Sequence, residues 1–189
     1  MSDLTLLGLC GALRAGSTNR MLMRLAAERF GPARFVEGDL NFPLYDGDLE
    51  DSEGIPEAVT RLAAQIREAD AVVVSCPEYN RGVSGVMKNG LDWISRVKGG
   101  VWRDKPVAIM AATDGRAGGE RSQMMLRWCM TPFRAHLLQG PEVLVADSSN
   151  AFDAEGRLQV ESYLKPLDEL MGDLRAAAEA RRAARAAAA

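Results

Sequence analysis

Short apolar runs in this chain alternate with longer segments in which apolar residues recur every three or four positions. The runs at residues 4–10, 71–76 and 105–113 are largely apolar from end to end. Runs of this kind are typical of strands inside a parallel sheet, where helices cover both faces. Weaker runs near residues 34–37 and 142–146 predict two further strands.

The helical segments follow the strands in regular alternation. Their apolar faces consist of Leu22, Leu25, Ala26 and Phe30; Val59, Leu62, Ala63 and Ile66; Met87, Leu91 and Ile94; Met125, Leu126, Cys129 and Phe133; and Leu164, Leu167, Leu170, Met171 and Leu174. Alternating strands and helices joined by right-handed crossovers form a doubly wound sheet. We therefore predict an α/β fold, a flavodoxin-like doubly wound five-stranded parallel sheet in the order 2-1-3-4-5 with helices on both faces.

Most of the chain is expected to form one domain, because 189 residues of which 47% are hydrophobic suffice for one full core. We assign residues 1–174 to the flavodoxin-like domain and residues 175–189 to an Ala/Arg-rich helical tail. That tail has high helix propensity, little to bury and no assigned function. The acidic segment 39–53 is expected to be a solvated loop, with a lid or a partner contact as alternatives.

Composition and charge narrow the partners and the compartment. A formal net charge of -3 gives no general attraction to nucleic acid. No run approaches the roughly 18 apolar residues that a membrane span needs, and no basic segment precedes the first apolar run. The three cysteines, Cys10, Cys76 and Cys129, lack metal-ligand spacing and are typical of reduced, buried thiols. We expect a cytoplasmic protein without nucleic-acid, membrane or metal binding.

Candidate chemistry gathers where the first, third and fourth strands end, because sheets of this order bind ligands at the carboxyl ends of their strands. The loop after the first strand places Arg14, Ser17, Thr18 and Asn19 at a helix N-terminus. Free N–H groups, the helix dipole and the arginine favour a phosphate there. Neither the Walker nor the Rossmann glycine pattern is present. An ordinary capped helix with a surface arginine is the alternative.

The loop after the third strand opens with Pro77, Glu78, Tyr79 and Asn80. Proline fixes the backbone, tyrosine offers a packing face, and asparagine both donates and accepts hydrogen bonds. This set suits the edge of a planar heteroaromatic ring. The alternative is a pair of exposed loop residues followed by an Asx turn at Asn80.

The loop after the fourth strand supplies Thr113 and Gly115. Its glycines leave room for a ligand to approach the backbone. The same glycines would also serve as plain turn residues.

Taken together, these segments resemble the NADPH-dependent FMN reductase family, which includes quinone, chromate and azo-dye reductases. The stretches FPLYDGDLED and GGERSQMMLR also look like their counterparts in the family, so the resemblance spans nearly the whole chain. The family's GSLRxxSxN loop is matched by Gly11, Leu13, Arg14, Ser17 and Asn19, and its PEYNxSxPGxLKNAIDWxSR segment by Pro77 to Asn80, Gly85, Lys88, Asn89, Asp92, Trp93, Ser95 and Arg96.

The resemblance implies an FMN-binding domain that takes hydride from NADPH or NADH and passes electrons to a small acceptor such as a quinone, flavin, chromate or azo compound. It also implies a homodimer or homotetramer with the flavin near the interface. No catalytic acid or base is expected, because the chemistry belongs to the cofactors. The implied roles are phosphate binding by Arg14, Ser17, Thr18 and Asn19, ring contact by Pro77, Glu78, Tyr79 and Asn80, and pocket closure by Thr113 and Gly115.

Three positions depart from the family pattern. Ala12 replaces a serine and removes one phosphate donor, Ser84 replaces a loop proline, and Gly90 replaces a helical alanine. We expect weaker FMN binding or a looser second loop. The lost hydrogen bond should cost only about 0.5–1.5 kcal/mol, so binding should survive.

Several other residues are expected to be structural. The only histidine, His136, lies far in sequence from the three loops. Cys76 is expected to be a small, buried apolar side chain. Trp93, Trp102 and Trp128 are read as core or subunit-contact aromatics. Arg116 is a candidate ligand of the NADPH 2′-phosphate.

Two other functions remain open at this point. A flavodoxin-like electron carrier would bind flavin without reacting directly with NAD(P)H, and a regulator could have kept the fold without the flavin. The net charge of the chain, -3, is small for an electron carrier that is steered electrostatically toward a partner protein.

Overall fold

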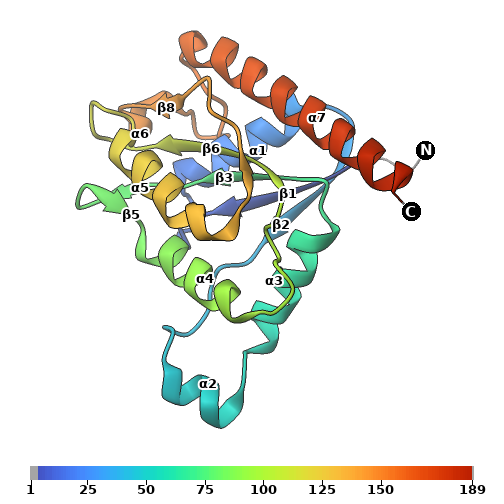
Figure 1. Ribbon diagram of the computed structural model, residues 1–189. Helices are drawn as coiled ribbons and strands as arrows, with labels where there is room; N and C mark the ends of the chain where they lie inside the picture. Colours follow the sequence, from blue (N-terminus) through green and yellow to red (C-terminus); the bar gives the residue numbers. More distant parts are fainter. Residues whose placement is uncertain (1–3, 189) are drawn as a thin grey trace.

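The computed structural model describes residues 4–188 and consists of a parallel sheet between two layers of helices (Figure 1). The strand order is β2-β1-β3-β6, with β7 and β8 both beside β6, and every pair in this sheet is parallel. This confirms the predicted fold class and the order 2-1-3-4-5. The strands are β1 (Leu4–Cys10), β2 (Ala33–Gly38), β3 (Ala71–Ser75), β6 (Pro106–Ala112), β7 (His136–Leu137) and β8 (Val143–Val145).

The predicted fifth strand is present as β8, and the same edge of β6 pairs with a second short piece, β7, that the sequence did not predict. Pro106 of β6 lies opposite His136 of β7, while Met110 lies opposite Val143 of β8. Between the two pieces comes Pro141, which has no N–H to donate to the ladder. The ladder on this edge of β6 is therefore interrupted.

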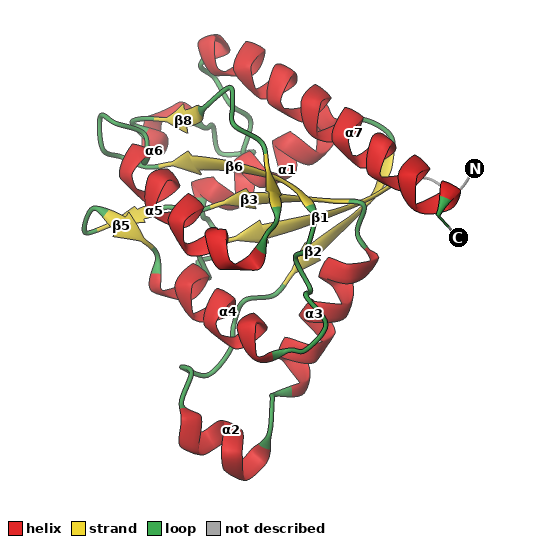
Figure 2. Ribbon diagram, viewed as in Figure 1, coloured by secondary structure: helices red, strands yellow, loops and turns green. Residues whose placement is uncertain are grey.

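Helices cover both faces of the sheet, as Figure 2 shows. Alternate residues of β1 point to opposite layers, so that Leu6 packs beside α1 and α7 while Leu7 packs beside α3 and α4. The helices are α1 (Thr18–Phe30), α2 (Gly47–Glu53), α3 (Glu57–Glu68), α4 (Gly85–Arg96), α5 (Glu120–Met130), α6 (Ser148–Ala151) and α7 (Leu164–Ala187), with short 3-10 turns η1 (Thr131–Phe133) and η2 (Glu161–Tyr163).

The acidic segment differs from the sequence prediction, because it contains the helix α2 rather than a loop alone. The Asp46 side chain accepts a hydrogen bond from the Asp48 N–H, which caps the helix start. Gly54, with a φ of 80°, ends it. These are ordinary start and stop signals, and they outweigh the polar composition of the segment. Figure 1 shows α2 projecting beyond α4, away from the sheet.

The second loop also contains structure that the sequence did not predict. Its first residues form a short hairpin of β4 (Glu78–Tyr79) and β5 (Gly82–Val83). Asn80 and Arg81 form its turn with φ values of 50° and 65°. Two consecutive residues with positive φ are typical of a tight hairpin turn that matches the strand twist.

The helix α7 continues without a break through residue 175, where the sequence analysis divided the chain. Ala178 is fully buried, so this part of the helix packs more closely than its composition suggested. The Arg175 guanidinium lies 5.5 Å from the centre of the Phe30 ring, and Arg182 pairs with Asp70 at 2.6 Å. Among residues 4–188, no helix is long and apolar enough to cross a membrane.

Candidate functional site

A pocket of about 650 Å³ lies at the carboxyl ends of β1, β3 and β6, and we call it the strand-end pocket. It is where sheets of this topology bind ligands. Asn80 does not line it, because this residue is exposed in the hairpin turn. The other nine predicted site residues do line it: Arg14, Ser17, Thr18, Asn19, Pro77, Glu78, Tyr79, Thr113 and Gly115.

The N-terminus of α1 is open toward an anion. Ser17 occupies the cap position, but its side chain makes no capping hydrogen bond. The first N–H groups of a helix have no intrahelical acceptor. Arg14, in the loop before the helix, is exposed beside them and lines the same pocket. Free donors, a helix dipole and a cation together fit the phosphate of FMN.

Asn19 contributes to this site in a different way from the one expected. Its side chain is buried, and Nδ2 donates to the Ala112 carbonyl at 2.7 Å. Its Oδ1 accepts from the Ser75 hydroxyl at 2.9 Å and from the Ala112 N–H at 3.1 Å. These contacts fix the start of α1 against the ends of β3 and β6. The carboxamide therefore positions the loop between β1 and α1 instead of serving as a free donor.

The carboxylate of Glu78 likewise interacts with other groups of the protein. Oε2 accepts from the backbone N–H groups of Arg121 and Ser122 at 3.1 and 3.4 Å, and Oε1 lies 3.7 Å from the Arg121 guanidinium. A carboxylate at a helix N-terminus is stabilised by the helix dipole. Glu78 thus fixes the hairpin to α5. Tyr79, beside it, is 57% exposed, which leaves its ring free to pack against a planar ligand.

A chain of polar groups on the far side of the pocket was missed by the sequence analysis. Thr18 Oγ1 donates to Ser148 Oγ at 3.2 Å, and Ser148 Oγ donates to the Asp114 carboxylate at 3.0 Å. The Ser149 N–H also donates to Asp114, and this bond, followed by the one from Ser148, holds the pKa of Asp114 below its usual range. Arg14 lowers it further. Asp114 therefore stays ionised and ties α6 to the third loop.

The sequence carried a usable signal for these residues. Asp114 directly follows the predicted Thr113, and Ser148 follows the predicted fifth strand, whose end meets the others at the same sheet edge. The remaining lining residues were not predicted either. They lie in the loop between β1 and α1, in α1, at the end of β6 and in the segment after α6. They are Ala12, Gly16, Met21, Ala112, Phe152, Asp153 and Ala154.

The departures from the family pattern are accommodated by local packing. Ser84 Oγ is buried, donates to the Gly11 carbonyl at 2.7 Å and accepts from the Met87 N–H at 3.2 Å. This serine ties the first loop to the second and caps α4, which opposes the loosening expected at this position. A Cβ at Gly90 would lie 2.7 Å from Leu40, so the glycine allows Leu40 to pack there.

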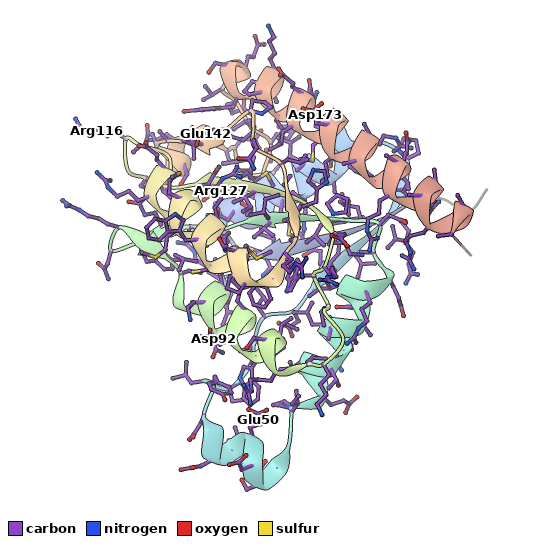
Figure 3. The ribbon with its side chains drawn as sticks, viewed as in Figure 1. Glu50, Asp92, Arg116, Arg127, Glu142 and Asp173 are labelled. Carbon is purple, nitrogen blue, oxygen red and sulfur yellow. The ribbon has the colours of Figure 1, made fainter. Side chains whose placement is uncertain are left out.

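The cysteines, the histidine and Arg116 do not line this pocket. Cys10 and Cys76 are buried, and burial raises the pKa of both thiols, which disfavours the thiolate. His136 is exposed in β7 beside the first residue of β6, at the opposite end of the sheet. Arg116 is exposed in the loop before α5 (Figure 3). No group of three potential metal ligands occurs among the residues that the structure describes.

Comparison with known proteins decides the family. The profile of the NADPH-dependent FMN reductase family matches residues 4–150, which include all three loops. The chain belongs to this family. An NADPH-dependent FMN reductase is an oxidoreductase, and this one passes electrons from NAD(P)H through FMN to a small acceptor.

Similar proteins cover most of the reductase. It is 41% identical over 158 residues to the NAD(P)H-dependent FMN reductase PA1204 of Pseudomonas aeruginosa, an alignment that covers 82% of this chain and 85% of the relative. It is 37% identical over 175 residues to a quinone reductase of Escherichia coli, covering 90% and 92%. The solved structure of FerB, a flavoenzyme NAD(P)H:(acceptor) oxidoreductase from Paracoccus denitrificans, matches with a TM-score of 0.82 and 29% identity over 93% of this chain and 97% of FerB.

Proposed function

We propose that the strand-end pocket holds the FMN and that a quinone is the acceptor of this reductase. The observation that carries the location is the open N-terminus of α1, where the Ser17 hydroxyl contacts the Cys10 thiol at 3.9 Å and makes no capping hydrogen bond, and where Arg14 lines the same pocket. The quinone class is supported by the relatives that are named quinone reductases. Bound FMN supplies the exchange of hydride and electrons between nicotinamide and acceptor.

The residues of the chain have separate tasks in this proposal. Arg14, Ser17 and the first N–H groups of α1 bind the phosphate, while Thr18 connects that end of the pocket to Ser148. Pro77 and Tyr79 lie along the ring, and the third loop closes the remaining side. No side chain moves a proton, so the protein acts by alignment and by the fixed charges around the ring.

We also propose that the protein is cytoplasmic and forms a homodimer or homotetramer. The free thiols Cys10, Cys76 and Cys129 are consistent with a reducing compartment. Self-association is supported by large apolar side chains at the surface, among them Leu44 and Trp128 with exposed fractions of 81% and 78%.

The test is a two-step anaerobic reaction of the full-length protein. The protein is saturated with FMN, free flavin is removed, and NADPH and then benzoquinone are added while the flavin absorbance is followed. The proposal predicts retained flavin that bleaches with NADPH and recovers with the quinone. Flavin that stays oxidised with NADPH would support the electron carrier. A protein that retains no flavin would support the flavin-free regulator.

A further inference from the structure

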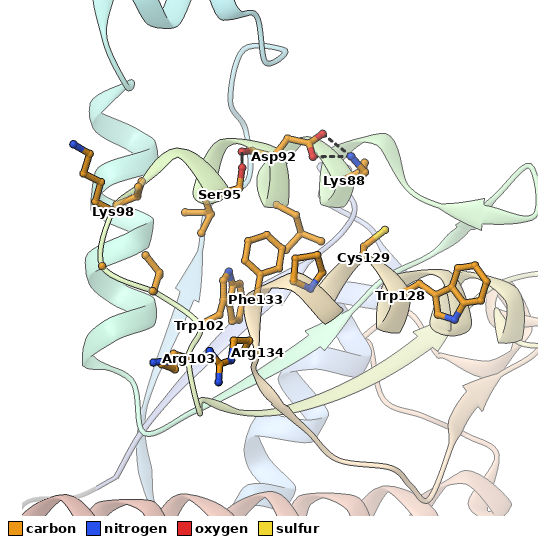
Figure 4. A pocket seen from close by; sticks show the side chains of 17 residues that line it. Lys88, Asp92, Ser95, Lys98, Trp102, Arg103, Trp128, Cys129, Phe133 and Arg134 are labelled. Carbon is orange, nitrogen blue, oxygen red and sulfur yellow. Dashed lines mark hydrogen bonds and ion pairs between the residues drawn. The ribbon is translucent and has the colours of Figure 1, made fainter.

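A second depression, distinct from the strand-end pocket, lies between α4 and α5 and is shown in Figure 4. We call it the α4–α5 groove. Its volume is about 900 Å³, and its apolar lining includes Leu91, Ile94, Trp102 and Phe133. At one end stands Trp128, whose ring is 78% exposed. An apolar depression of this size with an exposed indole beside it is typical of a surface that a partner covers.

The groove also carries unpaired positive charge. Lys98, Arg103 and Arg134 line it, and none of the three forms an ion pair within residues 4–188. The fourth cation, Lys88, is paired with Asp92 at 2.6 Å. A partner with several carboxylates and an apolar side chain would therefore complement this surface.

The acidic segment 39–53 has the matching properties. It contains six carboxylates and no lysine or arginine. No residue of its helix α2 is fully buried, although Leu49 packs against the core, and Leu44, just before that helix, is 81% exposed. We call this segment the acidic arm. A seven-residue helix gains little stability by itself, so an arm of this kind is expected to gain contacts from a partner.

The arm is nevertheless held in a defined position. Arg96 of α4 binds Glu50 at 2.8 Å, and Figure 3 shows Glu50 between α2 and α4. The Tyr45 N–H donates to Asn89 Oδ1 at 2.8 Å, and the Trp93 indole donates to the Pro43 carbonyl at 2.8 Å. The arm is thus presented in advance of any contact, which lowers the entropy cost of docking.

Opposite flanks of α4 hold the arm and the groove. Asn89 and Arg96 contact the arm, whereas Leu91 and Ser95 line the groove. Figures 1 and 4 both show α4 between α2 and α5. A two-fold axis parallel to α4 would place the arm of each copy opposite the groove of the other. An axis across α4 would instead place two acidic arms against each other, with repulsion between them.

We propose that the acidic arm of one copy docks in the α4–α5 groove of a second copy, and that the reciprocal contact closes the dimer. Leu44 then reaches the apolar lining near Trp128, and the free carboxylates of α2 face Lys98, Arg103 and Arg134. This inference rests on the proposed self-association and specifies its surfaces.

The experiment uses complementary charge reversals in the full-length, FMN-loaded protein, with sedimentation velocity as the readout. The arm variant is Asp51→Lys with Glu53→Lys, and the groove variant is Lys98→Glu with Arg134→Glu. The control reverses two exposed carboxylates on α7, Glu169→Lys with Asp173→Lys. Each test variant alone should associate at least tenfold more weakly than the wild type and the control.

An equimolar mixture of the two test variants should associate again, because each reversed arm then meets a reversed groove. A mixture that stays dissociated, or test variants that associate like the control, would overturn the docking while leaving self-association intact. A monomeric wild type would overturn self-association as well. Leu44→Ser should also weaken association, although it changes no charge and alters a side chain that is already exposed. The flavin absorbance of each variant shows whether it still holds FMN, so that weaker association can be distinguished from loss of the FMN site.

Discussion

Asn19 and Ala112 form a reciprocal pair of hydrogen bonds across 93 residues of sequence, in which the carboxamide donates to the Ala112 carbonyl at 2.7 Å and accepts from its N–H at 3.1 Å. On the β3 side of β6 the strand pairing ends at Met110, and the Asn19 side chain takes the place of a strand there, while Ala112 pairs with Val145 of β8 on the other side. Because Asn19 lies in the first turn of α1, the end of a central strand determines the position of the loop that we propose to bind the phosphate.

Asn19→Ala should lower both stability and FMN affinity. The substitution leaves buried partners at Ala112 and Ser75 without their hydrogen bonds, which should reduce the free energy of unfolding by about 1–3 kcal/mol. Urea unfolding and FMN titration measure the two effects. The control is Asn41→Ala at an exposed site, which should change stability by less than about 0.5 kcal/mol. Equal effects of the two variants would contradict the positioning role.

Ser84→Ala should separate the first loop from the second. It removes the bond to the Gly11 carbonyl and the cap on Met87, and the expected cost is about 1–2 kcal/mol of unfolding free energy. Ser162→Ala, at an exposed position, is the matched control. A Ser84→Ala variant as stable as the control would show that this serine does not tie the two loops.

Glu78→Gln should loosen the hairpin from α5. The amide keeps an acceptor but loses the charge that faces Arg121 and the helix N-terminus, so we expect a loss of about 0.5–1 kcal/mol. Hydrogen exchange at the start of α5 should rise in the same variant. The control is Glu120→Gln, which changes an exposed carboxylate in the first turn of α5. It should have a smaller effect on stability and on hydrogen exchange. If the two variants exchange at equal rates, Glu78 does not hold the hairpin.

Lys105 should make stability depend on alkaline pH. The side chain is 1% exposed, its Nζ donates to the carbonyls of Arg67 and Ala69, and burial, with a smaller contribution from Arg181, lowers its pKa from 10.5 to about 8. Between these values the unfolded chain binds more protons than the folded one, so the free energy of unfolding rises with pH in that window.

The measurement compares the wild type with Lys105→Met, using chemical denaturation between pH 7.5 and 10. The wild type should gain about 2 kcal/mol relative to the variant over this range. Lys165→Met, at an exposed lysine, should show no such trend. A difference between wild type and Lys105→Met that stays constant with pH would contradict the lowered pKa.

The sequence was informative where one physical rule dominates. Continuous apolar runs at β1, β3 and β6 predicted the sheet, and the rule that ligands bind at the carboxyl ends of strands predicted which loops would meet. Nine of the ten predicted site residues line one pocket as a result. The roles that Asn19 and Glu78 have within the protein were not visible, because their partners Ala112 and Arg121 are distant in sequence.

Other features depended on tertiary contacts that carry no local pattern. The helix α2 lacks an apolar face, and only the cap at Asp46 and the glycine at Gly54 indicate it. The end of α7 packs through a small residue, Ala178, and through Arg182, so no apolar periodicity predicts its contact with the domain. The hairpin turn at Asn80 required positive φ values at two non-glycine residues, which sequence patterns rarely indicate.

The most direct test of the strand-end pocket as the FMN site is the affinity of FMN compared with riboflavin, measured by flavin fluorescence for the wild type and Arg14→Ala. If the phosphate lies at the N-terminus of α1, the wild type should prefer FMN strongly. Arg14→Ala should weaken FMN by about 10–100-fold, which corresponds to about 1.5–3 kcal/mol for a charged hydrogen bond, and should leave riboflavin unchanged. Equal affinities of the wild type for the two flavins would contradict the account.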